Sequence, residues 1–231
     1  MNDSLQTQYG SALGGSLAVE RQRVLRNTYW LLALSMVPTV LGAWVGVSTG
    51  IMASLGFGMS TLVFFVGAFG LMFVVEKTKN SSTGVLALLA FTFFMGLMLS
   101  RLLAQILGFK NGSELIMMAF GGTGAIFFAM ASLATVIKRD LSGMGKFLFV
   151  GAIILLVAGL VNIFLQSSAL MLTVMVLAMA LFSAFMLYDI KRVLDGGETN
   201  YISATLAIYL DIYNVFQSLL SLLGIFGGER D

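Results

Sequence analysis

The sequence contains no cysteine and no histidine. These absences exclude disulfide bonds, thiol nucleophiles, a Ser-His-Asp triad and every zinc or haem site that depends on such ligands. Proline occurs only at position 38, so no other helix can owe a kink to proline. Charge is also scarce: Asp, Glu, Lys and Arg make up 10% of the 231 residues, whereas 58% are hydrophobic. A mean hydropathy of +0.97 excludes an ordinary soluble domain and predicts a polytopic membrane protein.

Long apolar runs divide the chain into segments that can each cross a bilayer core of about 30 Å. Lipid offers the backbone no hydrogen-bonding partners, so such runs form helices. The sequence predicts an all-α integral membrane protein, a bundle of seven transmembrane helices at residues 28–49, 51–75, 85–107, 114–137, 146–166, 169–190 and 201–226. Residues 1–20 are rich in Ser, Gly, Gln and Asn and have little apolar periodicity, which predicts a disordered cytosolic tail before a transmembrane domain at residues 21–231.

Lysine and arginine gather in the segment before the first predicted helix and in alternate connections after it. They are Arg21, Arg23, Arg26, Lys77, Lys79, Lys138, Arg139, Lys146, Lys191 and Arg192. The other connections and the C-terminus carry only Lys110 and Arg230. The positive-inside rule therefore predicts a cytosolic N-terminus and a C-terminus on the outer side. The net charge of +2 comes from these loops and gives no reason to expect nucleic acid as a partner.

The seventh predicted helix carries a small and polar face. At 100° per residue, Asp211, Asn214, Ser218 and Ser221 fall on one side of it. Such a face cannot favourably meet lipid, so this helix should lie at the centre of the bundle. The stripe would line either a polar packing seam or a water-accessible path.

Two aspartates are the strongest functional candidates, because a carboxylate in hydrocarbon costs several kcal/mol unless it finds partners or a proton. Asp189 lies near the end of the sixth predicted helix and Asp211 inside the seventh. If the two helices form a tight hairpin, the carboxyls meet in the cytosolic half and share a proton, which makes a pH sensor and a candidate Ca²⁺ site. Alternatively, Lys191 and Arg192 snorkel to the interface and neutralise Asp189.

Three further features have structural interpretations. Arg101 lies near the outer end of the third predicted helix, where its side chain can snorkel, and Glu114 suits the N-terminus of the fourth. An outer ion pair between Arg101 and Glu114 is a second candidate interaction. The Gly42, Gly46 and Gly50 ladder predicts close helix packing.

Several motifs resemble the Bax inhibitor-1 family over nearly the whole chain after the tail. They are Leu-Tyr-Asp at 187–189, Gly-Gly-Glu-Thr-Asn-Tyr at 196–201 and Tyr-Leu-Asp-Ile-Tyr-Asn-Val-Phe at 209–216. The match is closest to a bacterial inner-membrane branch that modulates the membrane AAA protease FtsH. The resemblance implies a central seventh helix and, in some members, a proton-sensitive Ca²⁺ leak gated by two aspartates, which map onto Asp189 and Asp211. Many members have Gly-Pro or Ser-Pro where this chain has Ser100-Arg101.

The hypotheses that follow are a pH-gated cation leak, with Ca²⁺ or H⁺ as the ion, and a modulator of FtsH that offers residues 1–20 as a handle. No cofactor is predicted. An intramembrane aspartyl protease would also use two aspartates on neighbouring helices, but its Gly-x-Gly-Asp and Pro-Ala-Leu elements are absent. We therefore predict no catalytic residue. A purely structural membrane interaction protein is the remaining alternative.

Overall fold

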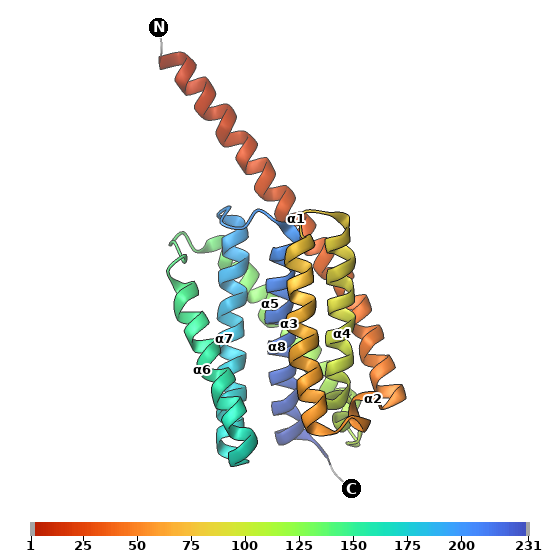
Figure 1. Ribbon diagram of the computed structural model, residues 1–231. Helices are drawn as coiled ribbons and strands as arrows, with labels where there is room; N and C mark the ends of the chain where they lie inside the picture. The colour runs from red at the N-terminus through yellow and green to blue at the C-terminus, as the bar shows by residue number, and fades with distance from the viewer. Residues whose placement is uncertain (1–2, 230–231) are drawn as a thin grey trace.

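The computed structural model describes the backbone of residues 3–229 and the side chains of residues 19–56 and 58–229. All regular structure in this part of the chain is helical (Figure 1). The helices are α1 (Asp3–Thr49), α2 (Ile51–Ser54), α3 (Gly56–Thr78), α4 (Ser82–Leu107), α5 (Gly112–Val136), α6 (Met144–Leu165), α7 (Ser168–Leu194) and α8 (Tyr201–Gly227). Seven of them are long and apolar enough to cross a membrane, which confirms the predicted fold class.

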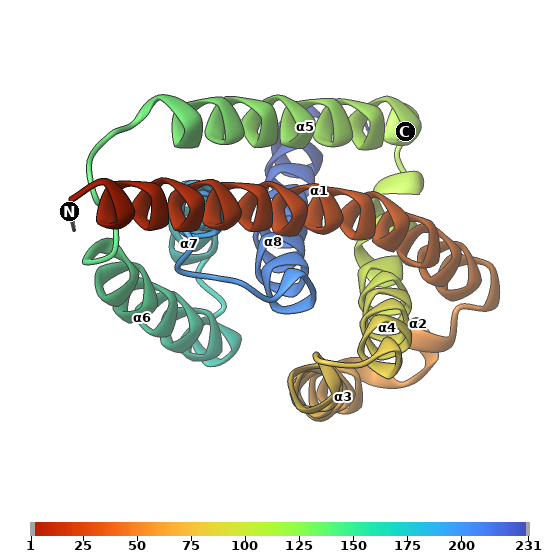
Figure 2. The same ribbon diagram turned by 90° about the horizontal axis from the view of Figure 1, so that it is seen from above.

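The central position of α8 is also confirmed. It packs against α1, α3, α4, α5 and α7, and the view along the bundle axis shows it surrounded by them (Figure 2). Its sequence mixes large apolar side chains with small and polar ones, and members of both kinds are buried, including Ile208, Tyr209 and Asp211. Since lipid would not tolerate the polar members, the surrounding helices are what allow this sequence to cross the membrane.

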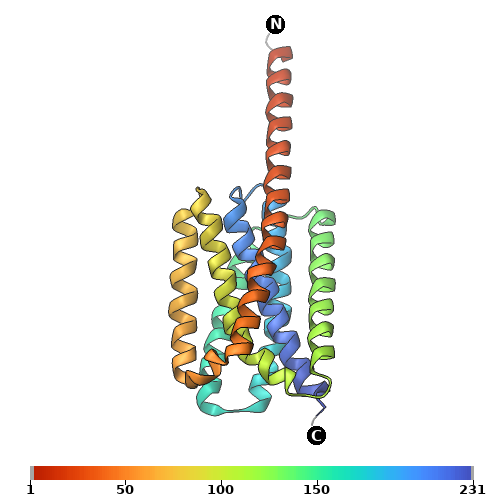
Figure 3. The same ribbon diagram turned by 90° about the vertical axis from the view of Figure 1, so that its right-hand side faces the viewer.

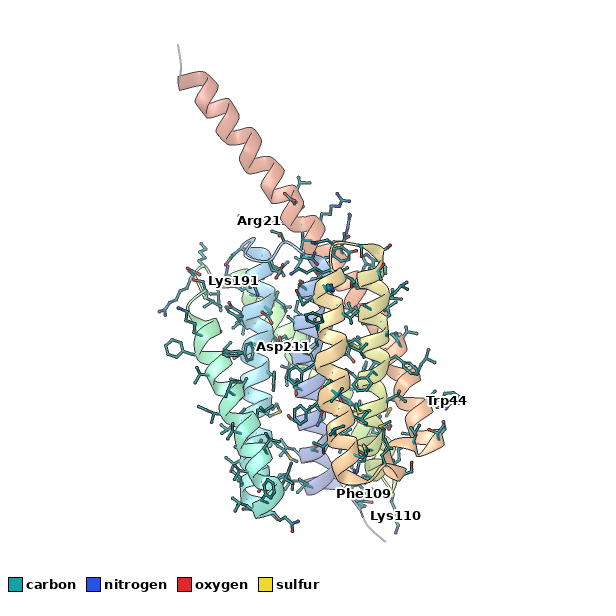
Figure 4. The ribbon with its side chains drawn as sticks, in the orientation of Figure 1. Arg21, Trp44, Phe109, Lys110, Lys191 and Asp211 are labelled. Carbon is teal, nitrogen blue, oxygen red and sulfur yellow. The ribbon has the colours of Figure 1, made fainter. Side chains whose placement is uncertain are left out.

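The two ends of the bundle differ in charge. The basic end carries the α3–α4 connection with Lys79, the α5–α6 connection with Lys138 and the last turn of α7 with Arg192, and the far end carries the α4–α5 connection with Lys110. Figure 4 places Arg21 and Lys191 at the basic end and Lys110 at the far end. The basic end is the one that the positive-inside rule predicts to face the cytosol.

The structure differs from the predicted disordered tail, because α1 continues without a break back to Asp3. Its N-terminal part projects beyond the basic end as a single helix (Figure 3). Arg21 lies where α1 reaches the bundle and packs against Gly196 in the α7–α8 connection. Residues 11–20 include Ala12, Leu13 and Leu17, which favour helix, and elongation from an existing helix avoids the cost of nucleation.

The second predicted helix is broken near its start. Residues 51–75 read as one apolar run, but the four-residue α2 is followed by a turn at Leu55 before α3 begins at Gly56. Gly56 has φ of 69°, a left-handed conformation that only glycine adopts at little cost. The break turns the chain at the far end, so the membrane-spanning part starts at about Gly58.

Glycines allow α1 and α4 to approach each other closely. A Cβ on Gly42 would collide with the carbonyl oxygen of Phe93, and one on Gly96 would collide with that of Thr39. Gly46 similarly faces Ser100. The predicted glycine ladder is therefore confirmed as a packing device at Gly42 and Gly46. Gly50 has open space around it instead and ends α1.

Replacing Gly96 with alanine is expected to destabilise the bundle by about 1–3 kcal/mol, because the added methyl group overpacks the α1–α4 contact. Gly70, in the middle of α3, is the matched control, since a Cβ there meets nothing within 4 Å. Gly70→Ala should leave stability unchanged or raise it by up to about 1 kcal/mol through helix propensity. Thermal unfolding in detergent micelles measures both. Equal effects of the two substitutions would contradict the packing role of Gly96.

Candidate functional site

The structure brings Asp189 and Asp211 together. Asp189 lies on the last turns of α7 and Asp211 lies three turns into α8, and their carboxyl groups lie close enough to interact across the α7–α8 interface. Asp211 is only 4% exposed and points into the bundle (Figure 4). The hairpin geometry comes from the short connection between α7 and α8, which makes the two helices antiparallel neighbours.

The cations next to Asp189 in sequence form ion pairs elsewhere. Lys191 Nζ lies 2.8 Å from Asp195 Oδ1, one helical turn further on. Arg192 Nη2 lies 3.2 Å from Glu198 Oε2 in the α7–α8 connection. Neither cation therefore neutralises Asp189 by direct contact, and the direct neighbour of the Asp189 carboxyl is the carboxyl of Asp211.

The environment of Asp211 favours a shared proton. Its Oδ2 is buried and has no hydrogen-bond donor among the described residues when both carboxyls are ionised. A proton placed on one of the two carboxyls supplies that donor and removes the repulsion between two charges held in a medium of low dielectric constant. Two carboxyls in this position can therefore bind and release a proton as a unit.

A cavity of about 350 Å³ leads from the basic end to Asp189. Its rim carries Glu76, Lys79, Arg192 and Glu198, while Asp189 lies on its wall. Lys79 Nζ is 2.8 Å from Glu76 Oε2, and this hydrogen bond and charge raise the pKa of Lys79 above its usual range. The rim thus holds two ion pairs, Lys79 with Glu76 and Arg192 with Glu198. The cavity connects the carboxyl pair with one side of the membrane.

Glu76 and Glu198 were not among the site residues predicted from the sequence. Both are acidic residues within a few positions of a helix end at the basic side; Glu76 precedes Lys77, and Glu198 belongs to the Gly-Gly-Glu-Thr-Asn-Tyr motif. Read along the chain, such charges look like solvated loop residues. Only the folded arrangement shows that α3 and the α7–α8 connection place them around one opening.

Asn200 fixes the start of α8 at this opening. Its side-chain oxygen accepts hydrogen bonds from the backbone N–H groups of Ile202 and Ser203, which caps the helix. Its amide nitrogen donates to the backbone oxygen of Lys79 at 3.0 Å and to Asn80 Oδ1 at 2.9 Å. One side chain therefore ties α8 to the α3–α4 connection.

Asn200→Ala is expected to lower stability by about 1–2 kcal/mol, because α8 loses its cap and the α3–α4 connection loses its tie. Asn200→Asp keeps the capping oxygen and loses only the two donated bonds, so it should cost less than the alanine variant. Thermal unfolding in micelles compares the two. An alanine variant as stable as the wild type would rule out this role.

A second cavity, of about 410 Å³, lies on the far half of the bundle. From α8 it is lined by Tyr213 and Gln217, and from α4 by Arg101. On α8 the cavity near Asp189 ends at Leu210, about one turn from Tyr213. Tyr213 donates a hydrogen bond to the backbone oxygen of Met95 at 3.3 Å, which holds its ring in the layer between the two cavities.

The predicted polar stripe on α8 lies beside these cavities rather than on them. Asn214, Ser218 and Ser221 line neither cavity, and Asn214 donates its amide to the backbone oxygen of Leu210 at 2.8 Å. These contacts correspond to the packing-seam alternative. Gln217, the exposed polar residue on this part of α8, was not among the residues predicted to form the stripe. Its signal was a glutamine at membrane depth, next to Ser218.

The candidate pair of Arg101 and Glu114 does not occur among the ion pairs of the described residues. Glu114 is exposed in the first turn of α5, the position in which an acidic side chain complements the helix N-terminus. Arg101 lines the cavity between α3, α4, α6 and α8.

The carboxyl pair alone is a poor permanent metal site. Within the described residues, no group of three or more acidic side chains is positioned to hold a metal ion. Ca²⁺ takes about six to eight oxygen ligands, and Asp189 and Asp211 supply four at most.

Comparisons with known proteins agree with this architecture. A family model described as "Inhibitor of apoptosis-promoting Bax1" matches residues 21–228. A Vibrio cholerae protein described as an uncharacterized membrane protein is 40% identical over 211 residues, which cover 90% of this chain and 91% of that protein. "Modulator of FtsH protease YccA" of Escherichia coli K12 is 38% identical over 87% of this chain and 90% of its own length. A protein of another Escherichia coli strain, described as "Inner membrane protein YccA", matches equally well.

Proposed function

Because this chain belongs to the Bax inhibitor-1 family and is a multi-pass inner-membrane protein, we propose that it is a pH-sensitive cation leak gated by Asp189 and Asp211. The contact between the two carboxyls carries the proposal. Protons and cations from one side can reach a carboxyl pair at the inner end of a cavity. The pair also borders the layer of side chains, at Leu210 and Tyr213, that separates the two cavities.

The gating step is a change in the number of protons on the pair. One shared proton supports the α7–α8 contact, since it gives the pair a hydrogen bond and a single negative charge. When that proton leaves, two negative charges repel each other in a site that excludes water. The repulsion loosens α8 against α7 and creates two carboxylates that attract Ca²⁺.

The orientation assigned to this mechanism places the basic end in the cytosol, as the distribution of Lys and Arg predicts. The pair would then respond to cytosolic pH through the cavity rimmed by Glu76, Lys79, Arg192 and Glu198.

Flux of Ca²⁺ into liposomes that contain the purified protein tests the proposal. The rate is expected to rise as the pH on the basic side rises, and the response should require both aspartates. Flux that is absent at every pH, or that ignores pH, would refute the proposed gate.

A second proposed role is modulation of the membrane AAA protease FtsH. It is supported by the name of the Escherichia coli relative and by the α1 extension, which projects beyond the basic end as a single helix. Purification of the chain from bacterial membranes under mild detergent is expected to recover FtsH with it. The two roles are compatible, because one uses the α7–α8 interface and the other uses α1.

No catalytic step is proposed for the carboxyl pair. Two carboxyls in contact are also the arrangement of an aspartyl protease, but the glycine-containing motif of the intramembrane enzymes is missing from both α7 and α8.

A further inference from the structure

The cavity that opens at the basic end contains a buried hydroxyl group without a hydrogen-bond partner. Ser203, in the first turn of α8, is 9% exposed and lines this cavity. Within the described residues its Oγ makes no hydrogen bond, although the carboxyl of Glu76 on α3 lies close enough to interact with it. Polar groups that are buried this deeply are almost always hydrogen-bonded, and a water molecule between the hydroxyl and the carboxyl satisfies both.

Glu76 connects this hydroxyl with the solution at the basic end. Its side chain is 45% exposed and lies two residues before the end of α3. Lys79 Nζ donates to Oε2 of the carboxyl and leaves Oε1 available to a second donor. Glu76 can therefore exchange protons with the solution and still face the cavity.

One face of α8 leads from Ser203 to the carboxyl pair. Ser203, Ala207 and Asp211 are four residues apart, so they follow one another along the helix at steps of about 6 Å. Ala207 lines the cavity, and its small side chain leaves space between the hydroxyl and the pair. About three water molecules at hydrogen-bonding distances of about 2.8 Å bridge the whole span of about 12 Å. A cavity of about 350 Å³ has room for them, since a water molecule takes about 30 Å³ in the liquid.

The charged groups that line this cavity come from three parts of the chain. α3 contributes Glu76 and Lys79, α7 contributes Asp189 and Arg192, and the α7–α8 connection contributes Glu198. α1, α4 and α5 also pack against α8, but none of their described residues lines the cavity. The two ion pairs leave the rim without net charge. The hydroxyl on α8 is the only uncharged polar side chain among the described residues of the lining.

We propose that Ser203 relays protons, through water, between Glu76 at the mouth of the cavity and the carboxyl pair at its inner end. The inference rests on the proposed function, because it explains how the pair that gates the leak exchanges its proton. The first water takes a proton from the Glu76 carboxyl, and each later water or hydroxyl accepts one proton and releases another until the pair holds it. Glu76 then regains a proton from the solution. A hydroxyl suits the middle of such a path because it donates and accepts at the same time.

Time-resolved infrared spectroscopy after a rapid drop in pH tests the relay, with the full chain in nanodiscs. Proton uptake by the pair is the carboxylic acid absorption that disappears in the double variant Asp189→Asn, Asp211→Asn. Ser203→Ala is expected to slow this uptake several-fold. It should not move the pH at which half of the pairs are protonated, because it removes no charge. Ser203→Thr keeps the hydroxyl and should retain the wild-type rate. Ser218→Ala is the matched control, since Ser218 is also 9% exposed on α8 but lines neither cavity.

Variants at the rim separate the role of Glu76 from that of rim charge. Glu76→Gln should lower the uptake rate about tenfold, because the mouth loses a proton acceptor and a negative charge. Glu198→Gln removes the same charge from the same rim but not the group beside Ser203, so its effect should be smaller. Ala207→Leu fills the space between Ser203 and Asp211 and should slow uptake, whereas Ala207→Ser should not.

The outcomes distinguish failure of the relay from failure of the proposed leak. Wild-type uptake in Ser203→Ala would overturn the relay, and equal slowing in Glu76→Gln and Glu198→Gln would overturn the part assigned to Glu76. A wild-type protein without the infrared signal of the pair would refute the shared proton, and with it both proposals. A normal signal in a protein that conducts no Ca²⁺ would refute the leak and leave the relay standing.

Discussion

Changing both Asp189 and Asp211 to asparagine is expected to abolish the pH response of Ca²⁺ flux through the reconstituted protein. Asparagine has nearly the same shape as aspartate and can still form a hydrogen bond across the α7–α8 interface, but it has no proton to lose in this range. The wild-type rate should change by up to about tenfold per pH unit while one proton titrates, and the double variant should show a flat profile.

The single variants sharpen this prediction. Asp211 is almost completely buried, whereas Asp189 lies on the cavity wall, so Asp211→Asn leaves an ionised group that water can reach and Asp189→Asn leaves one that it cannot. Both should lose the shared proton. The variant that retains Asp211 should be the less stable at high pH, because an isolated buried carboxylate is the more costly state.

Asp195→Asn is the control, since Asp195 is exposed, pairs with Lys191 and lies one turn beyond the site. Its flux and pH profile should match those of the wild type. If the double variant keeps the wild-type profile, the carboxyl contact is a structural feature and the gate lies elsewhere.

The sequence was sufficient for the fold because each span is a long apolar run with clear ends. The centrality of α8 also followed from its sequence, since Asp211 and Ser218 could not face lipid. The break between Gly50 and the second span was predicted, but the turn before Gly56 was missed because residues 51–75 are largely apolar and hydropathy does not register a left-handed glycine. The helix that extends back to Asp3 was missed because polar composition outweighed its continuity with α1.

The site was harder to predict, because the sequence does not show which acidic side chain each nearby cation pairs with in the folded protein. Lys191 and Arg192 follow Asp189 closely and looked like its natural neighbours, yet the helix geometry gives them to Asp195 and Glu198. The polar stripe predicted on α8 is also offset, by part of a turn, from the residues of α8 that line the cavities. A helical wheel groups Asp211 with Asn214 and Ser218, but which side meets a cavity depends on where α3 and α6 stand.

Removing residues 1–20 is expected to lengthen the lifetime of this protein several-fold in cells that contain FtsH. An ATP-driven protease must first engage a segment that unfolds easily, and the projecting part of α1 is a single helix outside the bundle (Figure 3). A lone helix of this length is marginally stable in water, so it unwinds at little cost. Decay after protein synthesis is stopped measures the lifetime.

Two replacements of residues 1–20 separate the handle from any specific recognition. A Gly/Ser segment of the same length should support turnover as well as the natural sequence does, because it is easily grasped. A segment of the (EAAAK) type, which is strongly helical, should slow turnover toward that of the deletion. In cells depleted of FtsH, all four forms should decay alike. If the deletion has no effect where FtsH is present, the α1 extension is not the handle, and any action on the protease must pass through the bundle.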